Sequence, residues 1–132
     1  MIPTEILEII NSFVNEVSPN EVWGIGSRFN GDHNENSDWD FLVFLDKVPL
    51  ENKRRNGLVD FILTDGKDNG IIKLESESNN TGFTFQSFKF MRTGKKTAEY
   101  QALNKSNTEL FKAYDSNAPK CILRNAFLII SR

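Results

Sequence analysis

Residues 22–45 read VWGIGSRFNGDHNENSDWDFLVFL, and this stretch decides how the rest of the chain is interpreted. An apolar run ends in G-x-G-S at residues 24–27, a polar segment follows, and Asp38-x-Asp40 opens a second apolar run. Side chains two residues apart on a strand point to the same face, so Asp38 and Asp40 are expected to lie side by side. Two carboxylates held that close repel each other unless a cation lies between them. The stretch therefore predicts a Mg²⁺ site beside a phosphate-binding turn.

The glycine turn has the residue types that suit a phosphate. Gly24 and Gly26 lack a Cβ, so the backbone can approach a ligand closely or adopt a positive φ. Ser27 adds a hydroxyl, and Arg28 adds a fork of donors that matches phosphate oxygens. Taken alone, G-x-G-S is more often the ordinary ending of a strand at a turn, and this alternative stays open.

A third acid lies inside the next apolar run, at residues 58–63. Asp60 has apolar neighbours on both sides, and a buried carboxylate without a partner is costly, so it must find a donor, a charge or a metal. The polar connection over residues 47–57 is short. If the strands 38–46 and 58–63 are neighbours, Asp60 joins Asp38 and Asp40. Three carboxylates can hold two Mg²⁺ ions, with water and substrate phosphates supplying the other oxygens.

Apolar spacing and turn residues predict the remaining elements of the first half. In the loop before Asp38, the residues Asp32, His33 and Glu35 are interpreted as solvated rather than catalytic. We expect an amphipathic helix over residues 3–17, a short strand over 21–26 and a turn or short helix followed by a loop over 29–37.

The second half of the chain gives weaker signals. The aromatic residues of 83–90 are interpreted as a strand that packs in the core, with stacking on a nucleic-acid base as the alternative. We also expect a short strand over 70–74, a loop over 75–82, a turn over 93–96, a capped helix over 107–114 and a last helix beginning at 118, with a strand over 126–130 as the competing interpretation.

Composition limits the class of protein. The chain has 132 residues, 39% of them apolar and 26% charged, which fits one globular domain over residues 1–132. No run approaches the roughly 18 apolar residues of a membrane span. One cysteine and one histidine exclude an internal disulfide and a Cys/His zinc set. The first residues lack the basic and apolar parts of a signal peptide, so a cytoplasmic location is expected.

Charge is distributed unevenly along the chain. Residues 1–66 carry a net charge of −7, and residues 67–132 carry +5. The acidic half contains the candidate metal site, and the basic half could meet a polyanionic phosphate. Scattered, solvated Lys and Arg side chains explain the second half equally well.

With the three acids in place, the chain resembles the DNA polymerase beta superfamily of nucleotidyltransferases, and especially its minimal nucleotidyltransferase members. The family pattern is an apolar strand, G-S, a further G, then S-D-x-D and a later acid within a strand. The resemblance covers about residues 22–63. Its matching positions are Gly26, Ser27, Gly31, Ser37, Asp38, Asp40 and Asp60.

The resemblance implies an α+β fold, with a mixed or antiparallel nucleotidyltransferase-type sheet and helices packed on it. It implies that Asp38 and Asp40 bind two Mg²⁺ ions. Asp60 would bind the catalytic ion and help to accept the proton of an attacking hydroxyl. Gly26 and Ser27 would hold the β- and γ-phosphates of a nucleoside triphosphate.

We therefore expect a Mg²⁺-dependent nucleotidyltransferase that moves a nucleoside monophosphate from a triphosphate to a hydroxyl. The acceptor classes are a partner protein, as in toxin–antitoxin pairs whose minimal nucleotidyltransferase modifies the toxin, a small molecule such as an aminoglycoside, or RNA. Two other functions stay open. One is a nucleotide-binding or regulatory module of the same fold that acts through a partner protein, and the other is a phosphodiesterase or related metal hydrolase.

Overall fold

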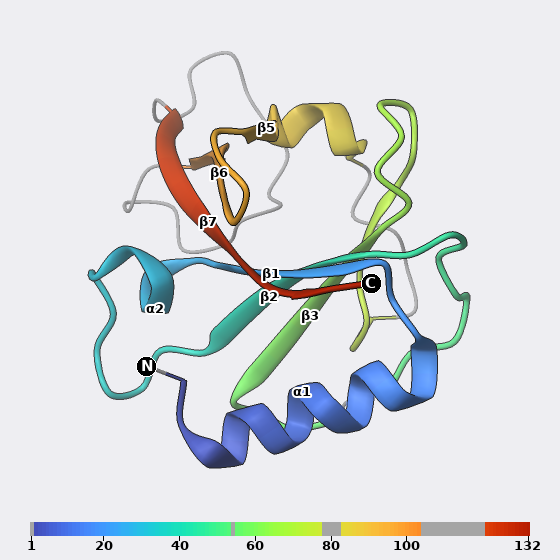
Figure 1. Cartoon of the computed structure of the whole chain (residues 1–132), viewed down its shortest axis with the longest axis vertical. Coiled ribbons are helices and arrows are strands. Elements are labelled where there is room, and N and C mark those ends of the chain that lie inside the picture. The colour runs from blue at the N-terminus through green and yellow to red at the C-terminus, as the bar shows by residue number, and fades with distance from the viewer. Residues whose placement is uncertain (1, 54, 78–82, 104–120) are drawn as a thin grey trace.

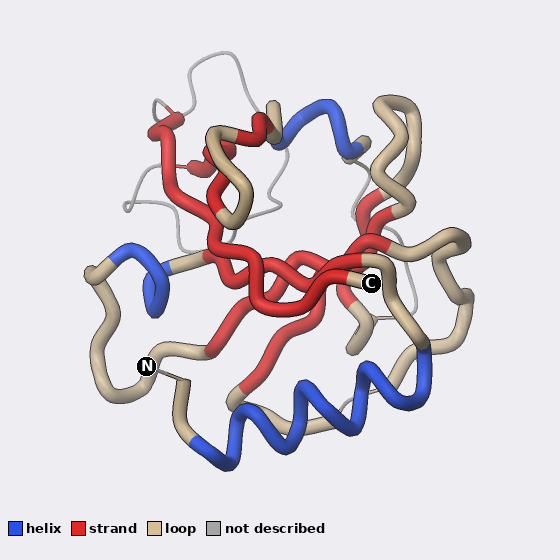
Figure 2. Tube along the Cα trace, in the orientation of Figure 1, coloured by secondary structure: helices blue, strands red, loops and turns tan. Residues whose placement is uncertain are grey.

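The computed structural model describes residues 2–53, 55–77, 83–103 and 121–132. Its described part is built on one curved, mixed sheet of seven strands in the order β4-β3-β2-β1-β7-β6-β5, with a long helix against one face (Figures 1 and 2). The expected α+β fold is confirmed. The elements are α1 (Thr4–Val17), β1 (Glu21–Ile25), α2 (Ser27–Asn30), β2 (Trp39–Phe44), β3 (Val59–Thr64), β4 (Ile72–Leu74), the 3₁₀ helix η1 (Phe85–Phe88), β5 (Met91–Arg92), β6 (Thr97–Leu103) and β7 (Cys121–Ser131).

Helix α1 agrees with the predicted amphipathic helix. Its buried side chains Ile6, Ile10 and Phe13 recur at spacings of three and four, so they form one stripe that packs on the sheet. The helix ends at Ser18, which adopts a left-handed φ of 48° and donates its backbone N–H to the Val14 carbonyl. Within the described ranges, no helix is long and apolar enough to cross a membrane.

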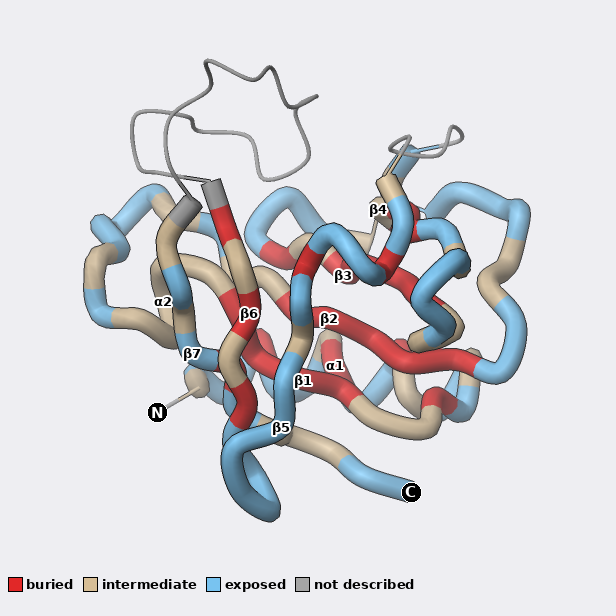
Figure 3. The backbone as a smooth tube through the Cα atoms, turned by 90° about the horizontal axis from the view of Figure 1, so that it is seen from above, coloured by how far each residue is buried: buried red, intermediate tan, exposed pale blue. Residues whose placement is uncertain are grey.

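The central strands separate two hydrophobic cores, and Figure 3 shows the buried backbone running along β1, β2 and β3. In β2, Phe41 and Val43 pack on the α1 side, whereas Leu42 and Phe44 pack on the opposite side with η1 and β6. This alternation is expected for a strand covered on both faces. The strand predicted over residues 38–46 is therefore confirmed.

Strands β2 and β3 run parallel and are hydrogen-bonded neighbours, unlike the other described pairs of the sheet, which are antiparallel. Their register places Asp40 opposite Asp60. The crossover between them spans only residues 45–58 and contains no described helix. The predicted adjacency of the two acid-bearing strands is therefore confirmed.

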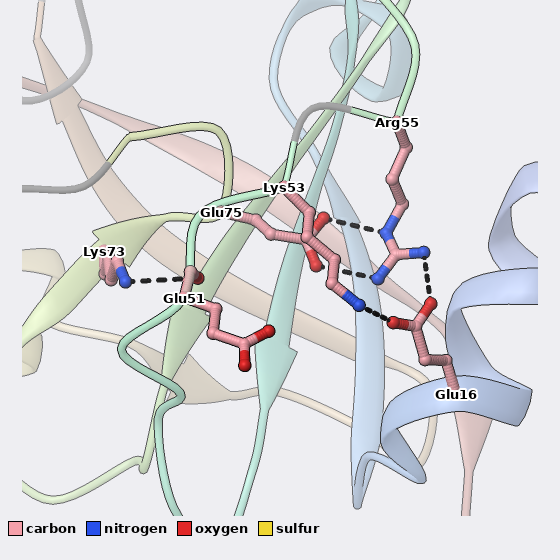
Figure 4. A network of polar contacts seen from close by, with 6 residues as sticks. All are labelled: Glu16, Glu51, Lys53, Arg55, Lys73 and Glu75. Atoms are coloured by element: carbon pink, nitrogen blue, oxygen red, sulfur yellow. Dashed lines mark hydrogen bonds and ion pairs between the residues drawn. The ribbon is translucent and has the colours of Figure 1, made fainter.

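A partly buried arginine fastens that crossover to the rest of the domain (Figure 4). Nε and Nη2 of Arg55 each donate to one carboxylate oxygen of Glu75 at 2.9 Å, and Nη1 donates to Glu16 of α1 at 2.7 Å. The guanidinium also lies over the Phe13 ring, 4.9 Å from its centre. Because Arg55 lies five residues before Asp60, these contacts fix the chain as it enters β3.

A buried lysine fastens the same crossover from the other side. Lys73 of β4 is 2% exposed, and its ammonium donates to the backbone carbonyls of Pro49 and Leu50 at 3.0 and 2.8 Å. A third, longer contact reaches the Glu51 carbonyl at 3.4 Å (Figure 4). Three carbonyl oxygens thus replace the water that a buried ammonium loses.

Arg55→Met is expected to lower the free energy of unfolding by about 3 kcal/mol, because the Glu75 carboxylate would stay buried after losing its bidentate cation. Urea unfolding of the variant measures this loss. Lys53→Met is the matched control, since Lys53 pairs with the same Glu16 but its side chain is 49% exposed. A control as unstable as Arg55→Met would show that burial of the Arg55–Glu75 pair is not the cause.

Residues 83–90 contain a 3₁₀ helix, so the strand predicted there is wrong. At three residues per turn, positions i and i+3 share a side, and this places both Phe85 and Phe88 in the core. Phe88 meets Tyr100 edge to face, with ring centres 5.9 Å apart. Only Thr84 pairs in strand fashion, with Ile71. These buried rings serve core packing rather than base stacking.

Residues 121–131 form strand β7, so the predicted C-terminal helix is wrong and its competing strand interpretation is correct. The stripe Ile122, Ala126 and Ile130 has a spacing of four, which places side chains on one face of a helix and equally on one face of a strand. Pairing with β1 on one side and β6 on the other decides for the strand. The helix predicted over 107–114 lies outside the described residues.

Candidate active site

Asp40 and Asp60 face each other across the parallel pair β2 and β3. Each precedes by two positions a residue of the core opposite α1, Leu42 and Ile62 respectively, so both carboxylates lie on the face away from α1. Asp38 lies just before β2 and is exposed, whereas Asp40 is partly buried. The structure therefore brings all three predicted acids to one end of the strand pair.

The three acids influence one another electrostatically. Burial, followed by the negative charges of Asp60 and Asp38, raises the pKa of Asp40 from 3.8 to about 7. Near neutral pH this carboxyl group is therefore only partly ionised, and a nearby cation would favour its charged form. A strongly perturbed acid among other acids is a frequent feature of functional sites.

The three carboxylates suit a divalent cation, although these side chains alone do not form a complete set of metal ligands. Carboxylate oxygens are the ligands that Mg²⁺ prefers, and Mg²⁺ usually completes its shell with water and substrate phosphates. Within the described ranges, no three His, Cys, Asp or Glu side chains are arranged as a metal-binding group. The chemistry of the three acids thus fits Mg²⁺, with the remaining ligands coming from outside the protein.

The predicted glycine turn lies directly against these acids. Gly26 has a φ of 77°, and a Cβ built on it would lie 2.4 Å from Oδ2 of Asp40. A side chain at 26 would therefore be strained and would collide with the carboxylate. At Gly24 a Cβ would lie 2.3 Å from the Phe29 ring. Gly24 therefore makes room for the packing of Phe29.

Two side chains from distant parts of the sequence hold the turn in place. The Tyr100 hydroxyl of β6 accepts the Gly26 N–H at 2.8 Å, and the Asn30 amide donates to the Gly26 carbonyl at 2.8 Å. Asn30 also accepts the backbone N–H of Asn125 in β7, at 2.8 Å. Burial raises the pKa of Tyr100 to about 12, so its hydroxyl stays protonated at neutral pH. The turn is thus locked to β6 and β7.

Comparison with known proteins agrees with this geometry. A sequence model of the nucleotidyltransferase domain matches residues 4–102. The chain belongs to the nucleotidyltransferase domain family. The predicted resemblance to the polymerase beta-like superfamily is thereby confirmed, and the matched segment contains the three acids, the glycine turn and Tyr100. Strand β7 lies beyond it. No curated protein and no solved structure matched the chain.

In this nucleotidyltransferase domain, Arg28 contacts the loop that precedes Asp38. Its Nε donates to the Ser37 carbonyl at 3.1 Å, its Nη2 donates to the Glu35 carbonyl at 3.3 Å, and its guanidinium lies 5.1 Å from the Trp39 ring centre. Trp39 packs against the core on the α1 side. Arg28 therefore fixes the loop that leads to Asp38.

Two residues that the sequence patterns did not reveal complete the surroundings of the candidate site. Arg124 of β7 forms a bidentate ion pair with Asp32, so the interpretation of Asp32 as a solvated loop residue is wrong. His33 and Glu35 are exposed, as expected. Tyr100 is the second missed residue, and it lies directly opposite Arg124 in the sheet.

Proposed function

We propose that this nucleotidyltransferase domain is an active, Mg²⁺-dependent enzyme that transfers a nucleoside monophosphate from a triphosphate to a hydroxyl acceptor. The observation that carries the proposal is the Asp40–Asp60 register on adjacent parallel strands. Two further observations support it. Together with burial and Asp60, the negative charge of Asp38 raises the pKa of Asp40, and Gly26 lies directly against the Asp40 carboxylate.

In the proposed reaction, the acceptor oxygen attacks the α-phosphorus and a new P–O bond forms. The bond from that phosphorus to the oxygen bridging to the β-phosphate breaks, and pyrophosphate leaves with the bonding electron pair. The proton of the attacking hydroxyl passes to Asp60. Asp60 lies opposite Asp40 rather than at the glycine turn, and this position supports a role on the acceptor side of the reaction.

Asp38 and Asp40 would hold two Mg²⁺ ions, and Asp60 would share the catalytic one. Bound ions of this kind supply positive charge to the attacking and leaving oxygens of an in-line displacement. Gly26 and Ser27 would contact the β- and γ-phosphates. For Arg28, the carbonyl contacts favour a role in positioning the Asp38 loop over a direct phosphate contact.

One observation favours a second candidate, a non-catalytic nucleotide-binding or regulatory module that acts through a partner protein. The Gly26 N–H, which a phosphate would be expected to accept, already donates to Tyr100. A module of this kind would bind a nucleotide without releasing pyrophosphate from it.

The test is to incubate the protein with each α-³²P-labelled nucleoside triphosphate and Mg²⁺. Total RNA, an aminoglycoside and the protein encoded beside it in the genome are supplied in turn as acceptors. The proposal expects pyrophosphate release together with transfer of label to one acceptor. Binding of Mg²⁺-nucleotide without release in any mixture would support the second candidate. Absence of metal-dependent binding would contradict both.

A further inference from the structure

Arg124 lies beside the residue that holds the glycine turn. It is directly opposite Tyr100 in the antiparallel pair β6 and β7, and residues opposite each other share a face of the sheet. The Tyr100 hydroxyl accepts the Gly26 N–H at 2.8 Å. A permanent positive charge is therefore separated from the turn by a single side chain.

This cation is held rigidly. Its side chain is 12% exposed, Nη1 donates to Oδ2 of Asp32 at 3.0 Å, and Nη2 donates to Oδ1. A bidentate pair fixes both the position and the plane of a guanidinium. Arg124 is therefore pre-oriented before any ligand arrives, which reduces the entropy lost on binding.

One donor of Arg124 is left over. Nε is buried and has no hydrogen-bond partner in the described part of the chain. A buried donor on a charged group without a partner is destabilising, and such groups in native structures usually have a reason. An anionic oxygen entering this site would satisfy the donor and would also meet the positive charge.

The other arginines of the described ranges also have partners. Arg28 donates to loop carbonyls, Arg55 to Glu75, Arg92 to Glu21 and Arg132 to Asn20 and Ser18. The three carboxylates of the site would repel the phosphates of a nucleotide until bound Mg²⁺ offsets their charge. Arg124 would add a fixed positive charge on the side of the glycine turn.

We propose that Arg124, a residue beyond the family-matched segment, binds the phosphates of the nucleoside triphosphate while Asp32 positions its guanidinium. This inference rests on the proposed function. The alternative is a purely structural role, in which the ion pair ties the loop before Asp38 to β7. The experiment must distinguish this role from phosphate binding.

Two variants break the same ion pair from opposite sides. Arg124→Gln removes the cation, and Asp32→Asn keeps it. Calorimetry with the mono-, di- and triphosphates of one nucleoside, in Mg²⁺, measures their affinities. We expect Arg124→Gln to weaken triphosphate binding about tenfold to hundredfold and monophosphate binding much less. Asp32→Asn keeps the cation and one acceptor oxygen for it, so it is expected to weaken triphosphate binding less than Arg124→Gln does, by about threefold to fivefold.

Arg92→Gln is the matched control, because Arg92 forms a comparable pair with Glu21 on the same sheet and is expected to bind triphosphate like wild type. If Arg124→Gln does not fold, Arg124→Lys keeps the charge but loses the fork, and it is expected to weaken triphosphate binding about threefold to tenfold. Equal losses in Arg124→Gln and Asp32→Asn, or no loss in Arg124→Gln or its lysine replacement, would overturn the inference while leaving the proposed function standing. Failure of the wild type to bind any Mg²⁺-triphosphate would instead overturn the proposed function itself.

Discussion

Asp40→Asn is expected to slow nucleotidyl transfer by a factor of about 10³, because the amide keeps the size of the side chain but removes the central negative charge of the metal site. Asp60→Asn is expected to have an effect of similar size, since it would remove both a metal ligand and the group proposed to accept the proton. Initial rates of pyrophosphate release under saturating triphosphate measure both losses.

Asp46→Asn is the matched control for these variants. Asp46 is an exposed acid just beyond the other end of β2, where its carboxylate accepts a hydrogen bond from Asn20. Its replacement is expected to leave the rate within about twofold of wild type. A rate for Asp40→Asn above about a tenth of wild type would contradict a catalytic role for that carboxylate.

Asp40→Asn is also expected to stabilise the metal-free protein at high pH. The folded state raises the pKa of Asp40 from 3.8 to about 7, so it binds more protons than the unfolded chain between these values. The stability contributed by the protonated group is therefore present below about pH 4 and is lost as pH rises through 7. The loss amounts to at most ~4 kcal/mol above pH 8. The Asp40→Asn variant has no carboxylate at this position, so it does not lose stability in this way as pH rises.

Urea unfolding in EDTA from pH 4 to pH 8.5 tests this expectation. The wild type should lose stability relative to Asp40→Asn as pH rises, whereas the difference between wild type and Asp46→Asn should stay constant. Mg²⁺ should restore stability to the wild type and not to Asp40→Asn, because a cation relieves the repulsion among the three carboxylates. Parallel pH profiles for wild type and Asp40→Asn would show that burial and like charge do not perturb this group.

Local sequence patterns were sufficient to predict that the three acids and the glycine turn lie together. Acids two residues apart at the start of an apolar strand, and a third within the next strand, are chemically costly features, so each one signals its own importance. The glycine turn was predicted because a residue without a Cβ can approach a ligand closely or adopt a positive φ. Gly26 has a φ of 77° and lies against Asp40. Adjacency of the two strands followed from their short connection, and the β2–β3 pairing confirms it.

The surroundings of the site could not be predicted in this way. Tyr100 is 74 residues from Gly26 in sequence, and Arg124 is 92 residues from Asp32. Only the strand order, in which β7 inserts between β1 and β6, brings these residues to the turn. The spacing of four along residues 122–130 fits both helix and strand, so the sequence pattern does not reveal that order.

The most direct test of the central claim is calorimetric binding of a nucleoside triphosphate with Mg²⁺ and with EDTA, to wild type, Asp40→Asn and Asp46→Asn. If the three acids and the glycine turn form one metal-dependent nucleotide site, wild type and Asp46→Asn bind one triphosphate per chain in Mg²⁺. EDTA and Asp40→Asn each abolish that binding. Triphosphate binding that is equally tight in EDTA, or unchanged in Asp40→Asn, would contradict the account.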